Sequence, residues 1–129
     1  MKANYKIAAA LIGSFALGVG AASVLHAQSK PAAYLVAQID VRDRDGFTKE
    51  FLPKTQTNMK EFGGKYLAGG FDKAIGLSDA APPNRVVLVQ FSDMDTAKAF
   101  YDKQKPIEAD VGSKYASFRI MAIEAVEPK

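Results

Sequence analysis

The side chains that could do chemistry in this chain are carboxylates, phenols and amines. The sequence has no cysteine and one histidine, His26, which lies in the N-terminal segment. Thiol catalysis, a Ser-His-Asp triad and histidine-based zinc or haem sites are therefore excluded for the domain that follows this segment. Any activity of the domain must use carboxylates, hydroxyls, amines and the shape of a pocket.

Aromatic and ionisable residues of the expected strands and helices are the candidates for a ligand pocket. They are Tyr34, Asp40, Lys65, Tyr66, Phe91 and Tyr101. A phenol in a pocket donates a proton or orients a carbonyl, and burial raises the pKa of a carboxylate towards that of a usable base. The alternative is structural, because aromatic side chains in a small domain usually form the core and Asp40 would be solvated if its strand ends there.

The segment Asp40–Gly46 superficially matches part of a calcium-binding loop. With Gly46 as the sixth position of such a loop, the first position would be Val41 and the twelfth Leu52, and neither side chain can bind a cation. A helix cap followed by a turn is the better interpretation of its aspartates. We therefore predict no metal site, and no cofactor is expected.

The run G-G-K-Y-L-A-G-G at residues 63–70 invites a phosphate-loop interpretation. No glycine in it is followed by Lys and then Ser or Thr, and an expected strand occupies the interval where backbone amides would surround a phosphate. A conformational role is favoured: Gly63 or Gly64 ends a helix in the left-handed region, and Gly69 or Gly70 forms a bulge or lets another backbone come close. The alternative is that these glycines let a ligand lie against the sheet.

The N-terminal segment has the order of a secretory signal peptide. Lys2 and Lys6 precede an uncharged stretch over residues 7–25, and small residues lead to Ala27. We expect residues 1–27 to be a cleaved signal; the alternative is an uncleaved membrane anchor, because the uncharged stretch approaches the roughly 20 residues that cross a bilayer. Either topology places the domain outside the cytoplasm, so the protein is expected to be periplasmic or secreted.

Without this leader the chain is close to neutral. The whole sequence has 17 Lys and Arg against 14 Asp and Glu, and removal of Lys2 and Lys6 leaves a net charge near +1. The remaining basic residues are dispersed among acidic ones, so the sequence gives no electrostatic basis for nucleic-acid binding. Membrane contact is expected only if the leader is retained. About 100 residues then form one domain with one core, which must be stable without disulfides.

Hydrophobic periodicity divides the rest of the chain into a tether, a domain and a tail. The boundaries are residues 28–32, 33–126 and 127–129. Strands are predicted over residues 34–41, 65–71, 85–91 and 117–126, with a little more strand around 74–77.

Two helices are predicted between these strands. The first begins after a cap at Asp43, is kinked or split by Pro53 and ends at the glycine pair 63–64. The second begins with a cap at Ser92 and ends at Pro106, and a short helix or irregular piece follows.

The order strand, helix, strand, strand, helix, strand is the ferredoxin-like arrangement, an α+β fold with a four-stranded antiparallel sheet. Two helices cover only one face of such a sheet. The strands over residues 34–41 and 85–91 are nevertheless apolar on both faces. The second face needs cover, and association with a second copy of the chain is the economical answer.

Four segments resemble one protein family. They are Y-L-V-A-Q-I-D-V from residue 34, F-G-G-K-Y-L-A-G-G from residue 62, R-V-V-L-V-Q-F from residue 85 and A-F-Y-D from residue 99. In these residues the chain is similar to the family called Domain of Unknown Function 1330, over about Ala33 to Val126. The resemblance implies a ferredoxin-like fold and a dimeric α/β barrel in which two sheets pack through their uncovered faces. It implies no activity.

The chain departs from the usual pattern of that family at several positions. Lys65 stands where relatives usually have Arg, and Ala68 where they often have a polar or basic residue. A Tyr near Pro106 and an Arg near Gly112 are also missing. A pocket that those side chains line in relatives would be altered here.

Two classes of function remain open from the sequence. We expect an exported homodimer that binds a small apolar or aromatic molecule inside the barrel. The alternative is a cofactor-independent enzyme, a small oxygenase or isomerase that uses Asp and Tyr side chains of the barrel, and this idea rests on analogy between folds. A cavity that places Asp40 or Tyr66 beside a second polar group separates these classes from a purely structural role.

Overall fold

The computed structural model describes residues 30–126, so the predicted leader with His26 and the predicted tail lie outside the described residues. The elements are β1 (Ala33–Val41), α2 (Arg44–Gly46), η1 (Phe47–Phe51), α3 (Leu52–Glu61), β2 (Lys65–Phe71), β3 (Arg85–Phe91), α4 (Met94–Asp110), η2 (Gly112–Lys114) and β4 (Ala116–Glu124). Within this part of the chain, no helix has the length and apolar character needed to span a bilayer.

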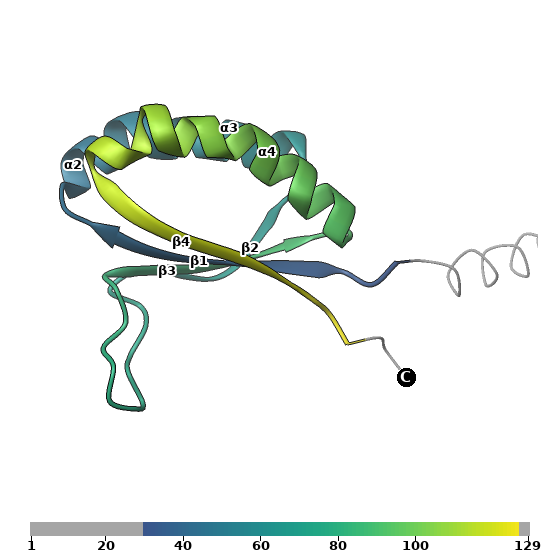
Figure 1. The fold of residues 1–129 in the computed structure, drawn as a ribbon, viewed down its shortest axis with the longest axis horizontal. Helices are drawn as coiled ribbons and strands as arrows, with labels where there is room; N and C mark the ends of the chain where they lie inside the picture. Colours follow the sequence, from purple (N-terminus) through teal and green to yellow (C-terminus); the bar gives the residue numbers. More distant parts are fainter. Residues whose placement is uncertain (1–29, 127–129) are drawn as a thin grey trace, which may run out of the picture. The chain divides into compact units, whose positions relative to one another are not determined.

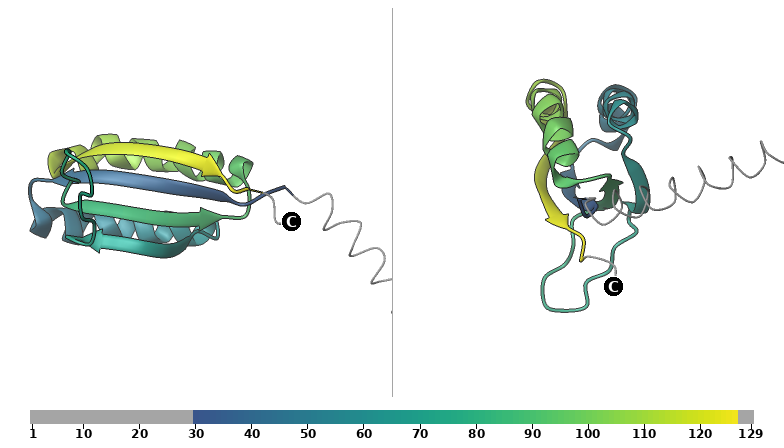
Figure 2. Two further views of the ribbon diagram at one scale, coloured as in Figure 1. Left: turned by 90° about the horizontal axis from the view of Figure 1, so that it is seen from below. Right: turned by 90° about the vertical axis from the view of Figure 1, so that its right-hand side faces the viewer.

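The four strands form one antiparallel sheet in the order β2-β3-β1-β4. The two strands whose sequences are apolar on both faces, β1 and β3, are at its centre. The helical segments lie side by side on one face of the sheet, and within residues 30–126 no helix lies on the opposite face (Figures 1 and 2). The predicted ferredoxin-like α+β fold with a four-stranded antiparallel sheet is confirmed.

The core lies between the helical layer and the sheet. Alternate residues of β1, from Ala33 to Val41, are buried against the helices, and β3 contributes Val87, Val89 and Phe91 on the same face. Phenylalanine rings connect the two layers. Their centroids lie 5.8 Å apart for Phe47–Phe71, 5.1 Å for Phe51–Phe118 and 5.0 Å for Phe91–Phe100. Truncation of one such buried ring to alanine typically costs about 3–5 kcal/mol of stability.

The first helical run begins as predicted, because the Asp43 carboxylate accepts a hydrogen bond from the Gly46 N–H at 3.1 Å. It continues without interruption through the π-helical segment η1 into α3, where Pro53 lies in the first turn. Proline has no N–H to donate, so one helical hydrogen bond is missing there, directly after the wider turn of η1. The disturbance predicted at Pro53 therefore takes the form of a π-helical turn before it.

The second helix differs from the prediction at both ends. Its cap is Asp93, not Ser92: the Asp93 carboxylate accepts hydrogen bonds from the N–H and hydroxyl of Thr96, both at 2.8 Å. The prediction that Pro106 ends the helix is wrong, because α4 continues to Asp110. Pro106 is exposed, while Gln104 and Glu108 on either side of it are buried. Their tertiary contacts offset the hydrogen bond that proline removes.

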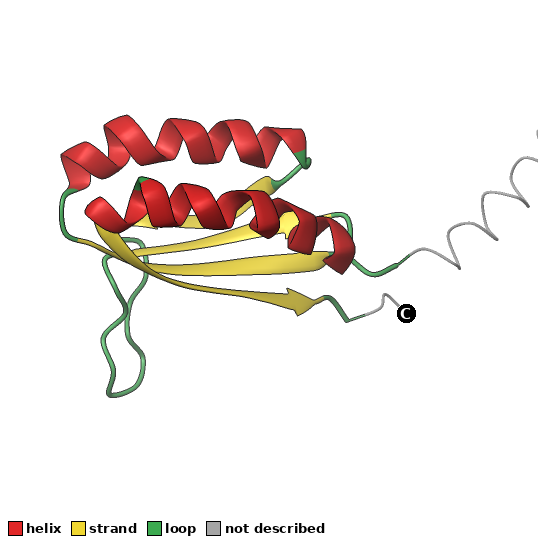
Figure 3. Cartoon of the chain, turned by 45° about the horizontal axis from the view of Figure 1, so that its top comes forward, coloured by secondary structure: helices red, strands yellow, loops and turns green. Residues whose placement is uncertain are grey.

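Residues 72–84 form a loop, so the short strand predicted around 74–77 is absent. The loop projects from the sheet on the side away from the helices (Figures 1 and 3). The Asn84 side chain holds its end in place, because it donates to the Val41 carbonyl and accepts from the Val41 N–H, both at 2.8 Å.

The glycines of β2 bring two backbones together. The predicted bulge lies between Tyr66 and Ala68, earlier than the glycine pair at which we expected it. The expected close approach is confirmed at Gly69, where φ is +100° and an added Cβ would lie 1.9 Å from the Val86 carbonyl oxygen. Gly63 has φ of +68° and ends α3 as predicted.

The substitution Gly69→Ala should destabilise the domain by about 2–4 kcal/mol, because it adds a steric clash to an unfavourable backbone conformation. Gly63→Ala is the matched control. Its φ is also positive but no atom lies within 4 Å of the added Cβ, so the loss should be about 1 kcal/mol. Urea unfolding measures both values, and equal losses would contradict the proposed close approach of β2 to β3.

Candidate functional site

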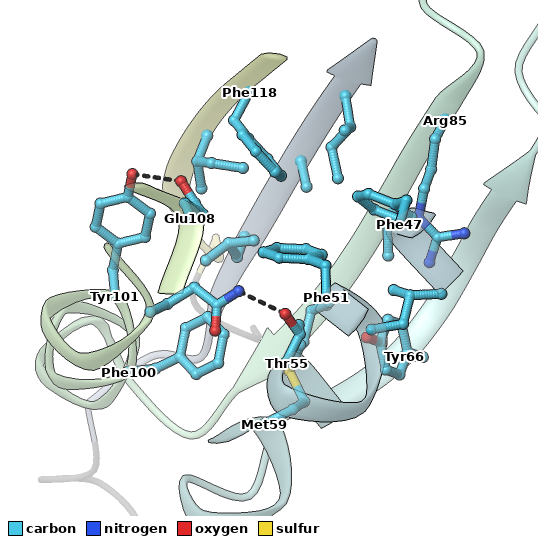
Figure 4. Close-up of a pocket in the computed structure, with 18 residues that line it drawn as sticks. Phe47, Phe51, Thr55, Met59, Tyr66, Arg85, Phe100, Tyr101, Glu108 and Phe118 are labelled. Carbon is cyan, nitrogen blue, oxygen red and sulfur yellow. Dashed lines mark hydrogen bonds between the residues drawn. The ribbon is translucent and has the colours of Figure 1, made fainter. Parts of the chain in front are cut away.

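A cavity of about 40 Å³ lies between the sheet and the helical layer (Figure 4). Most of its wall is apolar, with contributions that include Leu35, Ala37, Ile39, Phe47, Phe51 and Ile120. Ala37 is central to this arrangement, because its short side chain faces the helices from the middle of β1 between two larger residues. A cavity of roughly 150 Å³ is needed to hold benzene, so the observed space suits a molecule of only a few non-hydrogen atoms.

Glu108 and Tyr101 form a polar pair in this apolar wall. Both come from α4, and the Tyr101 hydroxyl donates to the Glu108 carboxylate at 3.0 Å. Burial raises the pKa of Glu108, and the hydrogen bond from Tyr101 offsets part of that rise. Burial, the nearby Glu108 charge and the same hydrogen bond raise the pKa of Tyr101 to about 12. The pair is therefore a carboxyl group that holds a proton more readily than usual, beside a phenol that stays neutral.

Three further polar side chains connect α3 to α4 next to the cavity. The Gln104 amide donates to the Thr55 hydroxyl at 2.8 Å, and the Asn58 amide donates to the Gln104 carbonyl oxygen at 2.9 Å. All three side chains are buried. Thr55 and Gln104 also line the cavity, whereas the Asn58 Oδ1 is buried without a hydrogen-bond partner. These hydrogen bonds fix the spacing of the two helices above the cavity.

Arg85 and Tyr66 lie on the opposite side of the cavity from Glu108 (Figure 4). Arg85 is on the helix-facing side of β3, and its guanidinium carbon lies 4.9 Å from the Phe71 ring centroid and 5.7 Å from that of Phe47. Burial lowers the pKa of Arg85, although an arginine stays cationic at neutral pH. Partial burial raises the pKa of Tyr66, and the Arg85 charge offsets part of that rise.

The structure separates the six candidates named from the sequence. Tyr66 and Tyr101 line the cavity, while Phe91 is 1% exposed and packs in the core against Phe100. The other three, Tyr34, Asp40 and Lys65, belong to positions that face away from the helices. Asp40 is exposed there and borders an open groove between the sheet and the 72–84 loop. In the cavity, Tyr101 is thus near Glu108 and Tyr66 is near Arg85. Asp40 does not line the cavity.

Sequence reasoning missed Glu108, Gln104, Thr55 and Arg85. A usable signal existed for α4, because Phe100, Gln104 and Glu108 recur at a spacing of four residues and so share one face of a helix. Expecting the helix to end at Pro106 hid this pattern. Arg85 likewise alternates with Val87, Val89 and Phe91, which places it on the core face of its strand.

Among residues 30–126, no group of three His, Cys, Asp or Glu side chains is positioned to hold a metal ion. The cavity offers one carboxylate, one guanidinium, two phenols and the hydroxyl and amide of Thr55 and Gln104. These groups can bind or protonate a small organic molecule.

Comparison with known proteins gives a family and a fold. The family model described as "Domain of unknown function (DUF1330)" matches residues 32–125. The crystal structure of a protein of unknown function from Rhodopseudomonas palustris is similar, with a TM-score of 0.54 and 12% sequence identity; the match covers 84% of this chain and 94% of that one. At this identity the likeness concerns the fold alone. Among proteins with curated descriptions, none matches the sequence.

The raised pKa of Glu108 predicts how stability depends on pH. A carboxyl group whose pKa is higher in the folded state stabilises the fold at acidic pH, and that contribution is lost as the pH rises through the folded pKa. Glu108→Gln removes this titration while keeping an oxygen that can accept from Tyr101. Its melting temperature should therefore fall less than that of the wild type between about pH 4.5 and about pH 8.

Glu50→Gln is the matched control, because Glu50 is an exposed glutamate of η1. It should show the wild-type difference between the two pH values in the same calorimetric measurement. If Glu108→Gln also shows the wild-type difference, Glu108 does not titrate in the way its burial implies.

Proposed function

Because the chain belongs to the family described as a domain of unknown function (DUF1330), its relatives supply no activity, and we propose from its own geometry that it binds a small organic molecule in the cavity between its helices and its sheet. The single observation that carries this proposal is the buried Glu108, hydrogen-bonded to the partly buried Tyr101, in a mostly apolar wall. Burial of a carboxyl group is costly for a fold, and an ionisable group with a shifted pKa in a cavity favours a role in binding.

The form of the cavity supports a ligand with an apolar body and few polar groups. Binding sites for small molecules are mostly apolar, with a few polar groups that set orientation. The observed volume favours a compact aliphatic molecule, and an aromatic ring of the kind expected from the sequence would need the wall to move. Tyr66 is 44% exposed on the edge strand β2, so this side of the cavity wall reaches solvent.

The second part of the proposal is a homodimer formed through the uncovered face of the sheet. Val36 pairs in register with Leu88 on β3 and with Met121 on β4, so three apolar side chains form a row across this face. The 72–84 loop projects on the same side and carries Ile75 and Leu77, which are 80% and 91% exposed. A second copy offers the same apolar row and is the simplest complementary partner.

Export is the third part of the proposal, and it rests on the sequence of residues 1–27. A basic start, an uncharged stretch and small residues near Ala27 have the order of a signal peptide. The domain lacks cysteine, so an oxidising compartment would leave its covalent structure unchanged.

A second candidate function is proton-transfer catalysis without a cofactor. Glu108, with its raised pKa, and the Tyr101 hydroxyl are within hydrogen-bond distance inside the cavity. This geometry favours Glu108 for the role of general base, which the sequence suggested for Asp40. The catalytic proposal predicts turnover that Glu108→Gln abolishes while binding persists.

Ligand binding predicts a specific effect of filling the cavity. Ala37→Leu should abolish binding of a small neutral probe such as acetamide, and overpacking should cost about 1–3 kcal/mol of stability. The measurement is the change in NMR shifts of the Leu35, Ile39 and Ile120 methyl groups during titration.

The matched control is Ala122→Leu, an exposed position on β4 outside the cavity wall. It should bind the probe like the wild type. Ala37→Val makes a smaller change and should weaken binding without unfolding the domain. Ile75 and Leu77 belong to the 72–84 loop and do not line the cavity. Shift changes confined to these two residues would contradict the cavity as the binding site.

The dimer proposal predicts that Met121→Lys weakens association by at least about tenfold, because it places a charge in the apolar row. Met121 is 41% exposed, so the fold of one subunit should tolerate the change. Ala99→Lys, on an exposed position of α4, is the control and should stay dimeric. Sedimentation at micromolar concentration measures both, and a wild-type protein that sediments as a stable monomer would overturn the proposal.

A further inference from the structure

Arg85 is a cation at the cavity without a counter-charge in the described part of the chain. It lies on the core face of β3 in line with Val87 and Val89. Its Nε is buried and has no hydrogen-bond partner, and no carboxylate within residues 30–126 pairs with its guanidinium. Burial of an unsatisfied donor on a charged group is costly, typically by more than about 1 kcal/mol. Arg85 lines the cavity, so a ligand anion that accepts from the terminal nitrogens of its guanidinium would offset part of the cost of burying this charge.

A second arginine in the same surroundings shows what Arg85 lacks. The guanidinium carbons of Arg44 and Arg85 lie 4.7 Å and 4.9 Å from the ring centroid of the same residue, Phe71. Arg44 also has an anionic partner, because its guanidinium contacts the Asp72 carboxylate at 2.7 Å. Arg85 has the aromatic support alone. The rings of Phe71 and Phe47 hold its planar group in place, which lowers the entropy lost when it binds an anion.

Tyr66 supplies a second donor at the same end of the cavity. It belongs to the neighbouring strand β2, faces the helical side opposite Val89 and lines the cavity together with Arg85. Its phenol interacts electrostatically with the Arg85 charge. A guanidinium and a phenol hydroxyl are both hydrogen-bond donors, and a carboxylate accepts from both.

We infer that the ligand of this cavity is a small monocarboxylate, whose anionic group binds Arg85 and Tyr66 and whose apolar body lies against Ala37 and Phe51. The inference rests on the proposed binding function and adds the chemical class of the ligand. Glu108 on the opposite side of the cavity disfavours a second carboxylate there, because two nearby negative charges repel. The small volume favours a short branched or unbranched chain over a ring.

Titration calorimetry with acetate and acetamide tests this inference, because the two probes have the same shape, differ in charge and have only four non-hydrogen atoms. Acetate should bind at least about tenfold more tightly than the amide. Arg85→Met should remove that preference, whereas Arg44→Met should retain it. Continued binding of acetamide to Arg85→Met would show that the cavity is intact in that variant. Succinate should bind more weakly than acetate.

The outcomes separate this inference from the function on which it rests. Equal binding of the acid and the amide, or an unchanged preference in Arg85→Met, overturns the carboxylate assignment and leaves a neutral-ligand site standing. Succinate that binds as tightly as acetate overturns the restriction to monocarboxylates. Absence of binding by both acetate and acetamide overturns the inference and the proposed function together.

Discussion

The packing of phenylalanine rings between one helical layer and one sheet is the interaction on which the rest of the structure depends. Phe47 and Phe51 from η1 and Phe100 from α4 meet Phe91 and Phe118 from the sheet. Without disulfides or a histidine-bound metal available, these contacts carry the stability of a domain of about 100 residues. Large rings also hold the helices away from Ala37, and the space that results is the cavity.

The two faces of the sheet have different tasks because only one of them has helices. On the covered face, buried polar groups have specific partners, as Tyr101 has for Glu108 and Gln104 has for Thr55. On the uncovered face, apolar side chains of the central strands remain partly accessible to solvent. Recognition of a small molecule is therefore proposed on the first face and recognition of a protein subunit on the second. The two proposals can therefore be tested separately, with substitutions on the covered face for ligand binding and on the uncovered face for dimerisation.

The alternating patterns of the strands were sufficient to predict the sheet, and two strands match residue for residue, 65–71 and 85–91. Helix ends were harder to predict, because Pro106 acts locally while Gln104 and Glu108 are held by distant residues. The family and fold were accessible from short strand motifs. The cavity was not, since it depends on how far rings from separate elements hold the helices from the sheet. Glu108 and Arg85 become candidate site residues only because the fold places both of them in the wall of this cavity.

The register of β1 has a practical consequence for how the domain can be handled. Ala33 pairs with Phe91 and Glu124 at one end of the sheet, and the Ala125 N–H donates to the Ala32 carbonyl beside it. Arg85 pairs with Ile39, six residues further along β1, which corresponds to roughly 20 Å. Both ends of the described chain thus leave the sheet far from the arginine. A surface or fusion partner attached at either end would therefore join the molecule far from the end of the sheet that carries Arg85.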